Sequence, residues 1–274
     1  MIAFTAAKNQ KLSRAAAANF PPVPYGAVMR LLREKAVKVN GVRVKEDVTL
    51  SAGDAVELFY DPPEIKPYGT IYADDNVVVI DKKRGYSSEN VYDALKTEYP
   101  AAKFIHRLDT NTSGLMIFAL TEEAEKELLS GFKNRAFDKK YIAAVKGVMP
   151  KKSEVLTAYL VKDPVKSQVK IYPSPVKNSV MIKTGYTTLK TEKGVSLIEV
   201  TLFTGKTHQI RAHLAYTGHP VVGDGKYGDN AFNRAHGAKK QLLTAVSIKL
   251  RFDKNSALEY LNDKTFRTEA DFKV

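Results

Sequence analysis

The residues of this chain that could do chemistry gather in three short stretches, and the first is His106–Gly114. It reads His-Arg-Leu-Asp-Thr-Asn-Thr-Ser-Gly and places an acid, two bases and three hydroxyls in a segment with turn character. In such a setting Asp109 could act as a nucleophile or general base, and Arg107 could bind a phosphate group. Composition alone favours a simpler interpretation, a polar loop in which Asp109 caps backbone amides, because aspartate is common in turns.

The second stretch, Lys139–Gly147, reads Lys-Lys-Tyr-Ile-Ala-Ala-Val-Lys-Gly. Tyr141, Ala143 and Val145 alternate along it, which predicts a strand with one apolar face and lysines on the other. The ring of Tyr141 could stack on a nucleic acid base. Alternatively, it is a core tyrosine whose hydroxyl finds a hydrogen-bond partner.

The third stretch, Thr204–Leu214, is followed by a glycine-rich segment, Gly223–Gly228. His208 and His213 are five residues apart, so they do not share a helix face as an i, i+4 metal pair would, and we expect no metal site. The glycines match a dinucleotide-binding fingerprint, which would suggest a nucleotide-dependent oxidoreductase. However, no helix pattern follows at residues 229–236 and no acid lies about twenty positions on, so we predict a tight turn instead.

Taken together, the three stretches resemble the signature of the RluA-type pseudouridine synthase family. That family has the pattern His-Arg-Leu-Asp-x-x-Thr-Ser-Gly, which residues 106–114 match completely. Its Lys-x-Tyr-x-Ala-x-Val-x-Gly strand matches residues 139–147. Its Thr-Gly-Arg-Thr-His-Gln-Ile-Arg-x-His segment matches residues 204–213 apart from Lys206, and the three motifs occur in the family's order.

The resemblance implies an enzyme that isomerises uridine in RNA to pseudouridine, with no cofactor and no metal ion. It implies that Asp109 is the nucleophile and that Arg211 pairs with it. The carboxylate would attack the ribose anomeric carbon or the base, or assist glycal formation, and the sequence does not choose among these routes. A non-catalytic RNA-binding or ribosome-assembly protein on the same fold is the alternative. Retention of Asp109, Tyr141 and Arg211 together argues against it.

The resemblance also assigns residues around the target base, which is flipped out of its stack before reaction. Tyr141 would pack on the base and help to remove the proton at C5, and Arg107 would stack in the vacated space. Leu243 would form an apolar wall of the uracil pocket, or it is plain core. Lys206, at a position where the family usually has arginine, keeps the charge for RNA binding but loses bidentate geometry.

Two further positions depart from the family pattern. Lys83 stands where a proline is usual, within the segment Lys83-Arg84-Gly85, and Thr244 stands where a histidine is usual. Neither change removes the nucleophile or its cation. We expect them to affect phosphate binding and substrate choice more than the isomerisation reaction itself.

The elements that must carry these motifs follow from the local sequence. Apolar runs at Asn76–Ile80 and Leu115–Leu120 predict buried strands. Thr121 and the acids after it predict the start of a helix that runs to about Leu129, with Ser130-Gly131 as its stop. We therefore expect an α+β fold in which a mixed, mainly antiparallel β-sheet of the pseudouridine synthase type forms the catalytic domain.

The N-terminal part of the chain predicts a second, smaller α+β domain. A helix is expected after Pro24, and Asn40-Gly41 between two valine-rich runs predicts a hairpin with a type I′ turn. This arrangement resembles the S4 RNA-binding module. We expect this domain at residues 1–60, a proline-rich linker at residues 61–67 and the catalytic domain at residues 68–274.

This N-terminal part is strongly basic. Met1–Lys45 holds nine lysines and arginines against one acid, Glu34, so 9 − 1 gives +8. The hairpin would set Lys38 opposite Arg43, and a phosphate lying across that face would explain the like charges, unless the two side chains simply splay apart. The candidates for RNA binding in this domain are Arg30, Arg33, Lys38 and Arg43.

The composition of the whole chain agrees with an RNA partner. Its 43 lysines and arginines exceed its 30 acids, which gives +13 and indicates a polyanionic partner. Two further basic stretches, residues 133–152 and 162–190, would extend the RNA-binding surface or form solvated strand edges. The absence of cysteine excludes disulfides, cysteine-ligated metals and thiol catalysis.

The sequence also sets expectations about the setting of the protein. No apolar run approaches the ~18 residues that span a bilayer, and no signal peptide is recognised, so a cytoplasmic protein without membrane contact is expected. The S4-like module favours ribosomal RNA as the substrate, with transfer RNA as the alternative. A monomer is expected.

Overall fold

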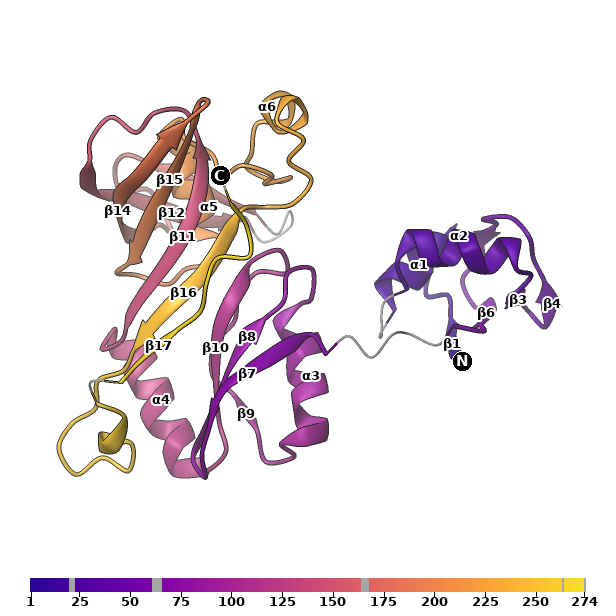
Figure 1. The fold of residues 1–274 in the computed structure, drawn as a ribbon, viewed down its shortest axis with the longest axis horizontal. Coiled ribbons are helices and arrows are strands. Elements are labelled where there is room, and N and C mark those ends of the chain that lie inside the picture. The colour runs from indigo at the N-terminus through magenta and orange to yellow at the C-terminus, as the bar shows by residue number, and fades with distance from the viewer. Residues whose placement is uncertain (20–22, 61–65, 164–167, 263, 274) are drawn as a thin grey trace. The chain divides into compact units, whose positions relative to one another are not determined.

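The computed structural model describes residues 1–19, 23–60, 66–163, 168–262 and 264–273. The chain divides into two compact units, Met1–Lys66 and Pro67–Val274. This division falls within the segment 61–67 that the sequence predicted as a linker, although residues 61–65 lie outside the described residues. Each unit is described by itself below, with the element labels of Figure 1.

The N-terminal unit is a small α+β structure. Its main sheet has the strand order β1-β6-β3-β4, and two short strands, β2 and β5, pair separately. Leu12, Val28 and Leu58 lie at the centre of its own apolar core. The elements are β1 Ile2–Thr5, β2 Gln10–Lys11, α1 Leu12–Ala18, α2 Tyr25–Arg33, β3 Val37–Val39, β4 Val42–Arg43, β5 Thr49–Leu50 and β6 Ala55–Leu58.

The hairpin between β3 and β4 forms as the sequence predicted. Asn40 and Gly41 have φ values of 52° and 78°, which a type I′ turn requires. Lys38 lies opposite Arg43 in the register. The Lys38 Nζ atom is 3.7 Å from the Glu57 carboxylate on β6, so a neighbouring acid already offsets part of the like-charge repulsion, and no phosphate is needed to explain the pair.

The second unit is built on one large sheet with the strand order β13-β12-β14-β15-β11-β16-β10-β8-β7, and β17 pairs with β16 while β9 pairs with β10. Among the described strands, every pairing in this sheet is antiparallel except that of β10 with β16. The strands are β7 Tyr68–Ala73, β8 Val77–Lys82, β9 Lys103–Phe104, β10 Ser113–Ala119, β11 Asp138–Lys146, β12 Ser153–Asp163, β13 Gln168–Tyr172, β14 Val180–Glu192, β15 Val195–Leu202, β16 Leu243–Lys249 and β17 Thr265–Arg267. The mixed, mainly antiparallel α+β architecture is thus confirmed.

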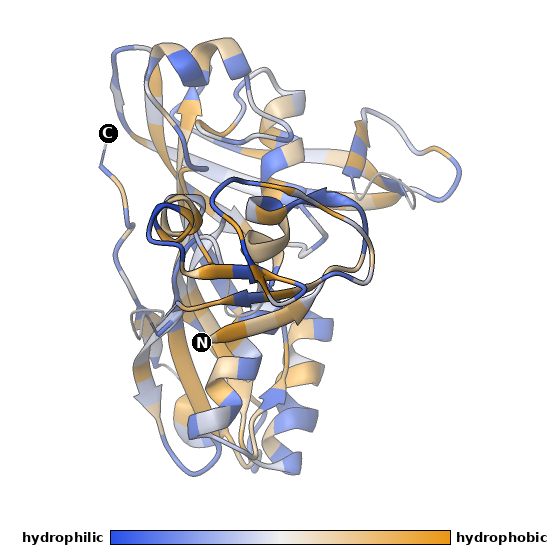
Figure 2. Ribbon diagram, turned by 90° about the vertical axis from the view of Figure 1, so that its right-hand side faces the viewer, coloured by the Kyte–Doolittle hydropathy of each residue, from blue (hydrophilic) through white to orange (hydrophobic). Residues whose placement is uncertain are grey.

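Helices cover both faces of the central strands (Figure 1). Val78 and Ile80 of β8 pack in one apolar cluster with α3, while Val77 and Val79 pack in another with α4. A strand that is buried on both faces reads as a continuous apolar run, which is why the sequence showed these strands clearly. The helices beside these strands carry both hydrophobic and hydrophilic residues (Figure 2). The helices are α3 Ser88–Glu98, α4 Glu122–Asn134, α5 Gln209–Tyr216, α6 Asn230–Ala235 and the 3-10 helix η1 Glu259–Leu261.

Of the helices in the described residues, none combines the length and the apolar character that a membrane crossing requires.

Helix α4 starts where the sequence predicted but ends later. The Thr121 hydroxyl accepts a hydrogen bond from the Ala124 N–H group, and the helix continues to Asn134 rather than stopping near Leu129. A Cβ atom on Gly131 would lie 2.1 Å from the ring of Phe137. Gly131 therefore serves close packing inside the helix, and the prediction that it stops the helix was wrong.

A second correction concerns residues 229–236, where no helix was expected. The structure has α6 there, and the Asp229 side chain caps it by accepting from the N–H groups of Ala231 and Phe232. The rings of Phe232 and His236 stack at 3.9 Å. A cap and one ring pair thus hold this short helix without the apolar periodicity that would have revealed it.

The parallel contact between β10 and β16 depends on one glycine. Ser113 pairs with Thr244 and Gly114 with Ala245. Gly114 has φ +110°, and a Cβ atom on it would lie 2.2 Å from the Ala245 carbonyl oxygen. The close approach of these two backbones fixes the end of the segment that carries Asp109.

We predict that Gly114→Ala destabilises the protein by about 2 kcal/mol or more, because the added methyl group meets backbone and the backbone angle is strained for any side chain. Thermal or urea unfolding measures this. Gly69→Ala is the matched control, since a Cβ atom there meets nothing within 4 Å and its backbone angle is not in the left-handed region. Equal unfolding midpoints for the two variants would contradict the prediction.

Candidate active site

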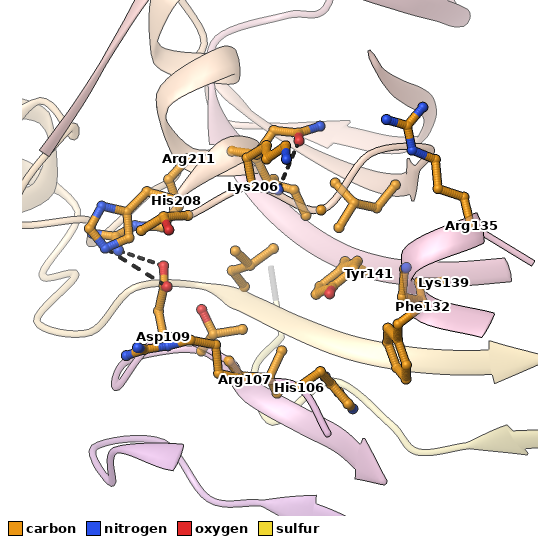
Figure 3. A pocket seen from close by; sticks show the side chains of 18 of the residues that line it. His106, Arg107, Asp109, Phe132, Arg135, Lys139, Tyr141, Lys206, His208 and Arg211 are labelled. Atoms are coloured by element: carbon orange, nitrogen blue, oxygen red, sulfur yellow. Dashed lines mark hydrogen bonds and ion pairs between the residues drawn. The ribbon is translucent and has the colours of Figure 1, made fainter. Parts of the chain in front are cut away.

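The three sequence motifs meet at one cavity of ≈ 550 Å³ in the second unit (Figure 3). The segment before β10, the start of β11, the segment leading into α5 and the start of β16 each contribute to its wall. Its lining residues are His106, Arg107, Leu108, Asp109, Thr112, Phe132, Lys133, Arg135, Lys139, Tyr141, Leu202, Gly205, Lys206, Thr207, His208, Gln209, Ile210, Arg211 and Leu243.

Asp109 and Arg211, which the resemblance paired, are in direct contact. The Arg211 Nη1 atom donates to the Asp109 Oδ2 atom at 2.7 Å. Asp109 belongs to the turn before β10, and Arg211 lies in the first turn of α5. The fold therefore brings together two residues that are 102 positions apart in the chain.

Arg211 is held from its other side by Asp224. Its Nε atom donates to Asp224 Oδ2 at 2.7 Å and its Nη2 atom to Asp224 Oδ1 at 2.9 Å. The Asp224 side chain is fully buried, and its Oδ1 atom also accepts from the backbone N–H groups of Lys226 and Tyr227. Because a guanidinium is planar, this bidentate grip fixes the direction in which Nη1 points at Asp109.

The sequence had placed Asp224 only in a glycine-rich turn and had given it no role. The signal that the sequence offered was an acidic residue that stands between two glycines. Nothing in the spacing indicated that this acid would reach Arg211.

The electrostatics favour the charged forms of this pair. Burial raises the pKa of Asp224, but the Arg211 guanidinium and two backbone N–H groups outweigh that effect, so the pKa is lowered overall. Burial lowers the pKa of Arg211, and the two carboxylates more than reverse this. The stability that ionised Asp224 contributes is present above the ordinary pKa of an aspartate and is lost as the pH falls through its lowered value.

His208 and Tyr227 complete the surroundings of Asp109 and were also missed. The His208 Nε2 atom is 3.8 Å from Asp109 Oδ1, and its Nδ1 atom is 2.9 Å from the Tyr227 hydroxyl. The Val169 N–H group donates to that hydroxyl, which is then free to donate its own proton to Nδ1. In this tautomer the ring proton is on Nε2 and faces Asp109. Burial lowers the pKa of His208, while the Asp109 charge acts in the opposite direction.

Tyr141 and Leu243 form the apolar part of the wall. Tyr141 is 8% exposed and Leu243 is 2% exposed. Burial, together with the nearby Asp109 charge, raises the pKa of Tyr141, so its hydroxyl is protonated at neutral pH. Both residues thus offer apolar surface to a flat group lying between them and Asp109.

Arg107 and Lys206 lie on the cavity wall with less burial. The Arg107 side chain is 66% exposed, and its Nη1 atom is 3.4 Å from Glu89 Oε1. Lys206 lines the same cavity. An exposed pair of this kind is weak in water and is easily exchanged for another partner.

The four candidates from the N-terminal basic region, Arg30, Arg33, Lys38 and Arg43, belong to the first unit. Arg30, Arg33 and Arg43 are exposed there, and Arg30 is 3.8 Å from Glu34.

A fully buried lysine, Lys82, contacts the turn that carries Asp109. The Lys82 Nζ atom donates to the carbonyl oxygens of Thr110, Tyr86 and Lys83 at 3.2, 2.7 and 3.2 Å. Burial and the charge of Arg84 lower the pKa of Lys82 to about 8, while Asp109 and other acids act against them. Carbonyl oxygens thus satisfy the lysine and tie it to the turn.

The two departures from the family pattern have structural explanations. The Lys83 N–H group, which a proline would lack, donates to the Pro67 carbonyl at 2.8 Å. The Thr244 hydroxyl is 2.9 Å from both the Ser113 hydroxyl and the Asp271 carboxylate, and Arg84 also pairs with Asp271. A C-terminal acid and a threonine thus link β16 to the start of β10.

Across the described residues, no group of three or more histidine or acidic side chains is arranged to hold a metal ion.

Comparisons of the sequence and of the fold with known proteins both match RNA pseudouridylate synthases. A family model described as RNA pseudouridylate synthase matches residues 65–216. The chain is 31% identical over 256 residues to the ribosomal large subunit pseudouridine synthase C of Vibrio vulnificus (strain CMCP6), which covers 83% of this chain and 80% of that protein. The protein of the same name from Escherichia coli (strain K12) is 30% identical over 263 residues, with 83% and 80% covered.

Among solved structures, the protein named human RNA pseudouridylate synthase domain containing 1 superposes with a TM-score of 0.63. The sequence identity is 22%, and the match covers 78% of this chain and 94% of that one. At this identity the likeness concerns the fold.

We predict that Arg211→Ala lowers the free energy of unfolding by about 3–5 kcal/mol at pH 7, because it leaves the buried Asp224 carboxylate without its cation. The resemblance alone, which pairs Arg211 only with Asp109, would predict a variant that folds normally. Adding Asp224→Asn should restore part of the lost stability. Urea denaturation measures both effects, and a single variant as stable as the wild type would contradict this account of Asp224.

Proposed function

Because this chain belongs to the RNA pseudouridylate synthase family, we propose that it converts uridine in large-subunit ribosomal RNA to pseudouridine with Asp109 as the nucleophile. The family makes the chain an isomerase that acts on RNA. The ribosomal substrate rests on the names of its relatives and on the excess of basic residues, with transfer RNA as the alternative. The observation that carries the assignment of Asp109 is its hydrogen bond to a doubly anchored Arg211.

In this isomerisation the bond between N1 of uracil and C1′ of ribose breaks, and a bond between C5 and C1′ forms. The C5 proton leaves and N1 gains one, so the product has the composition of the substrate. A carboxylate suits the first step because it can add to an electrophilic carbon or take up a proton and later leave. The same three routes remain open to Asp109, namely attack on C1′, attack on the base and assistance to glycal formation.

Arg211 and Tyr141 have separate roles in this proposal. Arg211 holds the Asp109 carboxylate in place by donating from Nη1, while the bonds from its Nε and Nη2 atoms to Asp224 fix the direction of that contact. The ring of Tyr141 packs on the uracil. Because burial raises the pKa of Tyr141, its hydroxyl carries its proton at rest, so help with the C5 proton requires a change that substrate binding brings.

The cavity wall suits an extruded base. Leu243 supplies apolar surface opposite the charged groups. The exposed Arg107 can leave Glu89, and its flat guanidinium can then stack in the space that the extruded base vacates in the RNA. Lys206 on the same wall supplies positive charge for the phosphate backbone.

The N-terminal unit is proposed as an S4-like RNA-binding module. Its sheet, its hairpin and its excess of basic residues support this role, through Arg30, Arg33, Lys38 and Arg43. A cytoplasmic location and a monomeric state stay predictions from the sequence.

We predict that Asp109→Ala lowers the release of tritium from RNA that contains [5-³H]uridine by about 1,000-fold or more, because the reaction loses its nucleophile. RNA binding should be largely kept. Asp93→Ala is the control, because Asp93 is exposed on α3 and lies outside the cavity wall. Turnover by Asp109→Ala at the rate of the Asp93 variant would refute the nucleophile, and with it the proposed mechanism.

We predict that deletion of residues 1–66 weakens RNA binding and makes it less sensitive to salt. The plot of log K against log salt has a negative slope, and each lost phosphate contact should make it shallower by about 0.7 for single-stranded RNA. Fluorescence anisotropy over a series of KCl concentrations measures the slope. The full chain with Arg33→Gln and Arg43→Gln should show a smaller change in the same direction, and an unaltered slope in the deletion variant would exclude an RNA-binding role for this unit.

A further inference from the structure

The end of the cavity that lies away from Asp109 is also positively charged. Figure 3 shows Arg135 and Lys139 beside Phe132 at this end, with Tyr141 between them and Asp109. Within the part of the chain that the structure describes, neither cation takes part in an ion pair or a side-chain hydrogen bond, and the interaction found for Lys139 is with the Phe132 ring at 5.0 Å. Two cations thus share one end of the cavity, and the acid whose charge acts on Lys139, Asp138, is itself paired with Arg251.

Lys139 points into the cavity because of its place on β11. Side chains alternate along a strand, so Lys139 lies on the same side as Tyr141 and both line the cavity. Lys140 lies on the other side, where its Nζ atom is 2.8 Å from the Glu199 carboxylate. Of these two adjacent lysines, Lys140 forms an ion pair with an acid, whereas Lys139 faces the cavity and forms no ion pair with any described residue.

Holding the two cations together has a cost when the cavity is empty. Burial and then the charge of Arg135 lower the pKa of Lys139, and the opposing charge of Asp138 does not outweigh them. The Phe132 ring, which supports Lys139, stacks on His106 at 4.5 Å. Burial lowers the pKa of His106 to about 3, so this histidine is neutral and adds no charge. An anion placed between Arg135 and Lys139 would relieve their repulsion.

Arg135 also occupies a backbone position that does not favour its residue type. It caps the C-terminus of α4 with φ 60°, in the left-handed region where glycine or asparagine is usual. Such strained positions tend to persist where the side chain serves a ligand. A positive charge at a helix C-terminus is itself favourable, which gives a purely structural explanation that experiment can separate from the functional one.

We propose that Arg135 and Lys139 form a binding site for a phosphodiester group of the RNA strand next to the target nucleoside. The inference rests on the proposed function and adds a subsite to it. A phosphodiester fits because it carries one diffuse negative charge and several acceptor oxygens, which a guanidinium and an ammonium can share. The site anchors the strand at one end of the cavity while Asp109 acts at the other.

The test compares full-length variants in binding to a fluorescein-labelled single-stranded oligouridylate. Lys139→Gln and Arg135→Gly should each make the negative slope of log K against log KCl shallower by about 0.7, and the double variant should make it shallower by about 1.4. Lys140→Gln is the matched control and should leave the slope unchanged. Slopes for Lys139→Gln and Arg135→Gly equal to that of Lys140→Gln would overturn the proposal.

The stability of Arg135→Gly separates the two explanations of that residue. Glycine relieves the backbone strain, so a phosphate-binding role predicts a Tm equal to or above that of the wild type together with weaker RNA binding. A lower Tm with unchanged binding would show that Arg135 serves only the helix end and would overturn its part in the site.

A competition experiment identifies the source of the anion. Inorganic phosphate should displace the oligouridylate no better than chloride at the same ionic strength. Displacement by inorganic phosphate that disappears in Lys139→Gln would assign the site to a free anion and overturn the assignment to RNA.

On ribosomal RNA from cells that lack this chain, Lys139→Gln should raise KM and keep kcat, whereas an unchanged KM would contradict the subsite. Oligouridylate binding does not require turnover. The subsite therefore stays testable in Asp109→Ala, even if the proposed function fails.

Discussion

The site depends on one guanidinium that is shared between two carboxylates. Asp224 takes two of the nitrogen atoms of Arg211, is fully buried and is held in turn by two backbone N–H groups. Only the remaining Nη1 atom is directed at Asp109. Because a buried ion pair is costly unless its geometry is well satisfied, the fold must hold the segment around Asp224 and the start of α5 in a fixed relation. The position of the Asp109 carboxylate then follows from that relation.

The segment that carries Asp109 is also held by contacts that involve its backbone. Lys82 links the Thr110 carbonyl oxygen of the turn to those of Lys83 and Tyr86, and Gly114 lets β10 approach β16 closely at the point where the turn ends. Thr244 and Asp271 reinforce the same junction from the C-terminal part of the chain. The carboxylate is therefore placed by parts of the chain that are far apart in sequence, and a change in any of them would move it.

The positions of paired and unpaired cations around the cavity indicate where the excess positive charge of the chain would contact RNA. Lys140 and Arg107 each lie within ion-pair distance of an acid, whereas among the described residues neither Arg135 nor Lys139 forms an ion pair. An excess of +13 alone would indicate only an affinity for polyanions. The side chains of β11 and of the end of α4 that line the cavity indicate a candidate path for an RNA strand.

The sequence by itself determined the features that local geometry encodes. Asn40-Gly41 required a type I′ turn, the continuous apolar runs of β8 and β10 required burial on both faces, and the motif around Asp109 indicated the chemistry. Only the tertiary structure decided that Asp224 anchors Arg211, that Gly131 sits inside a helix against Phe137, and that Lys139 rather than Lys140 faces the cavity. These features depend on contacts between distant segments, and neither periodicity nor residue propensity records which distant segment a side chain will meet.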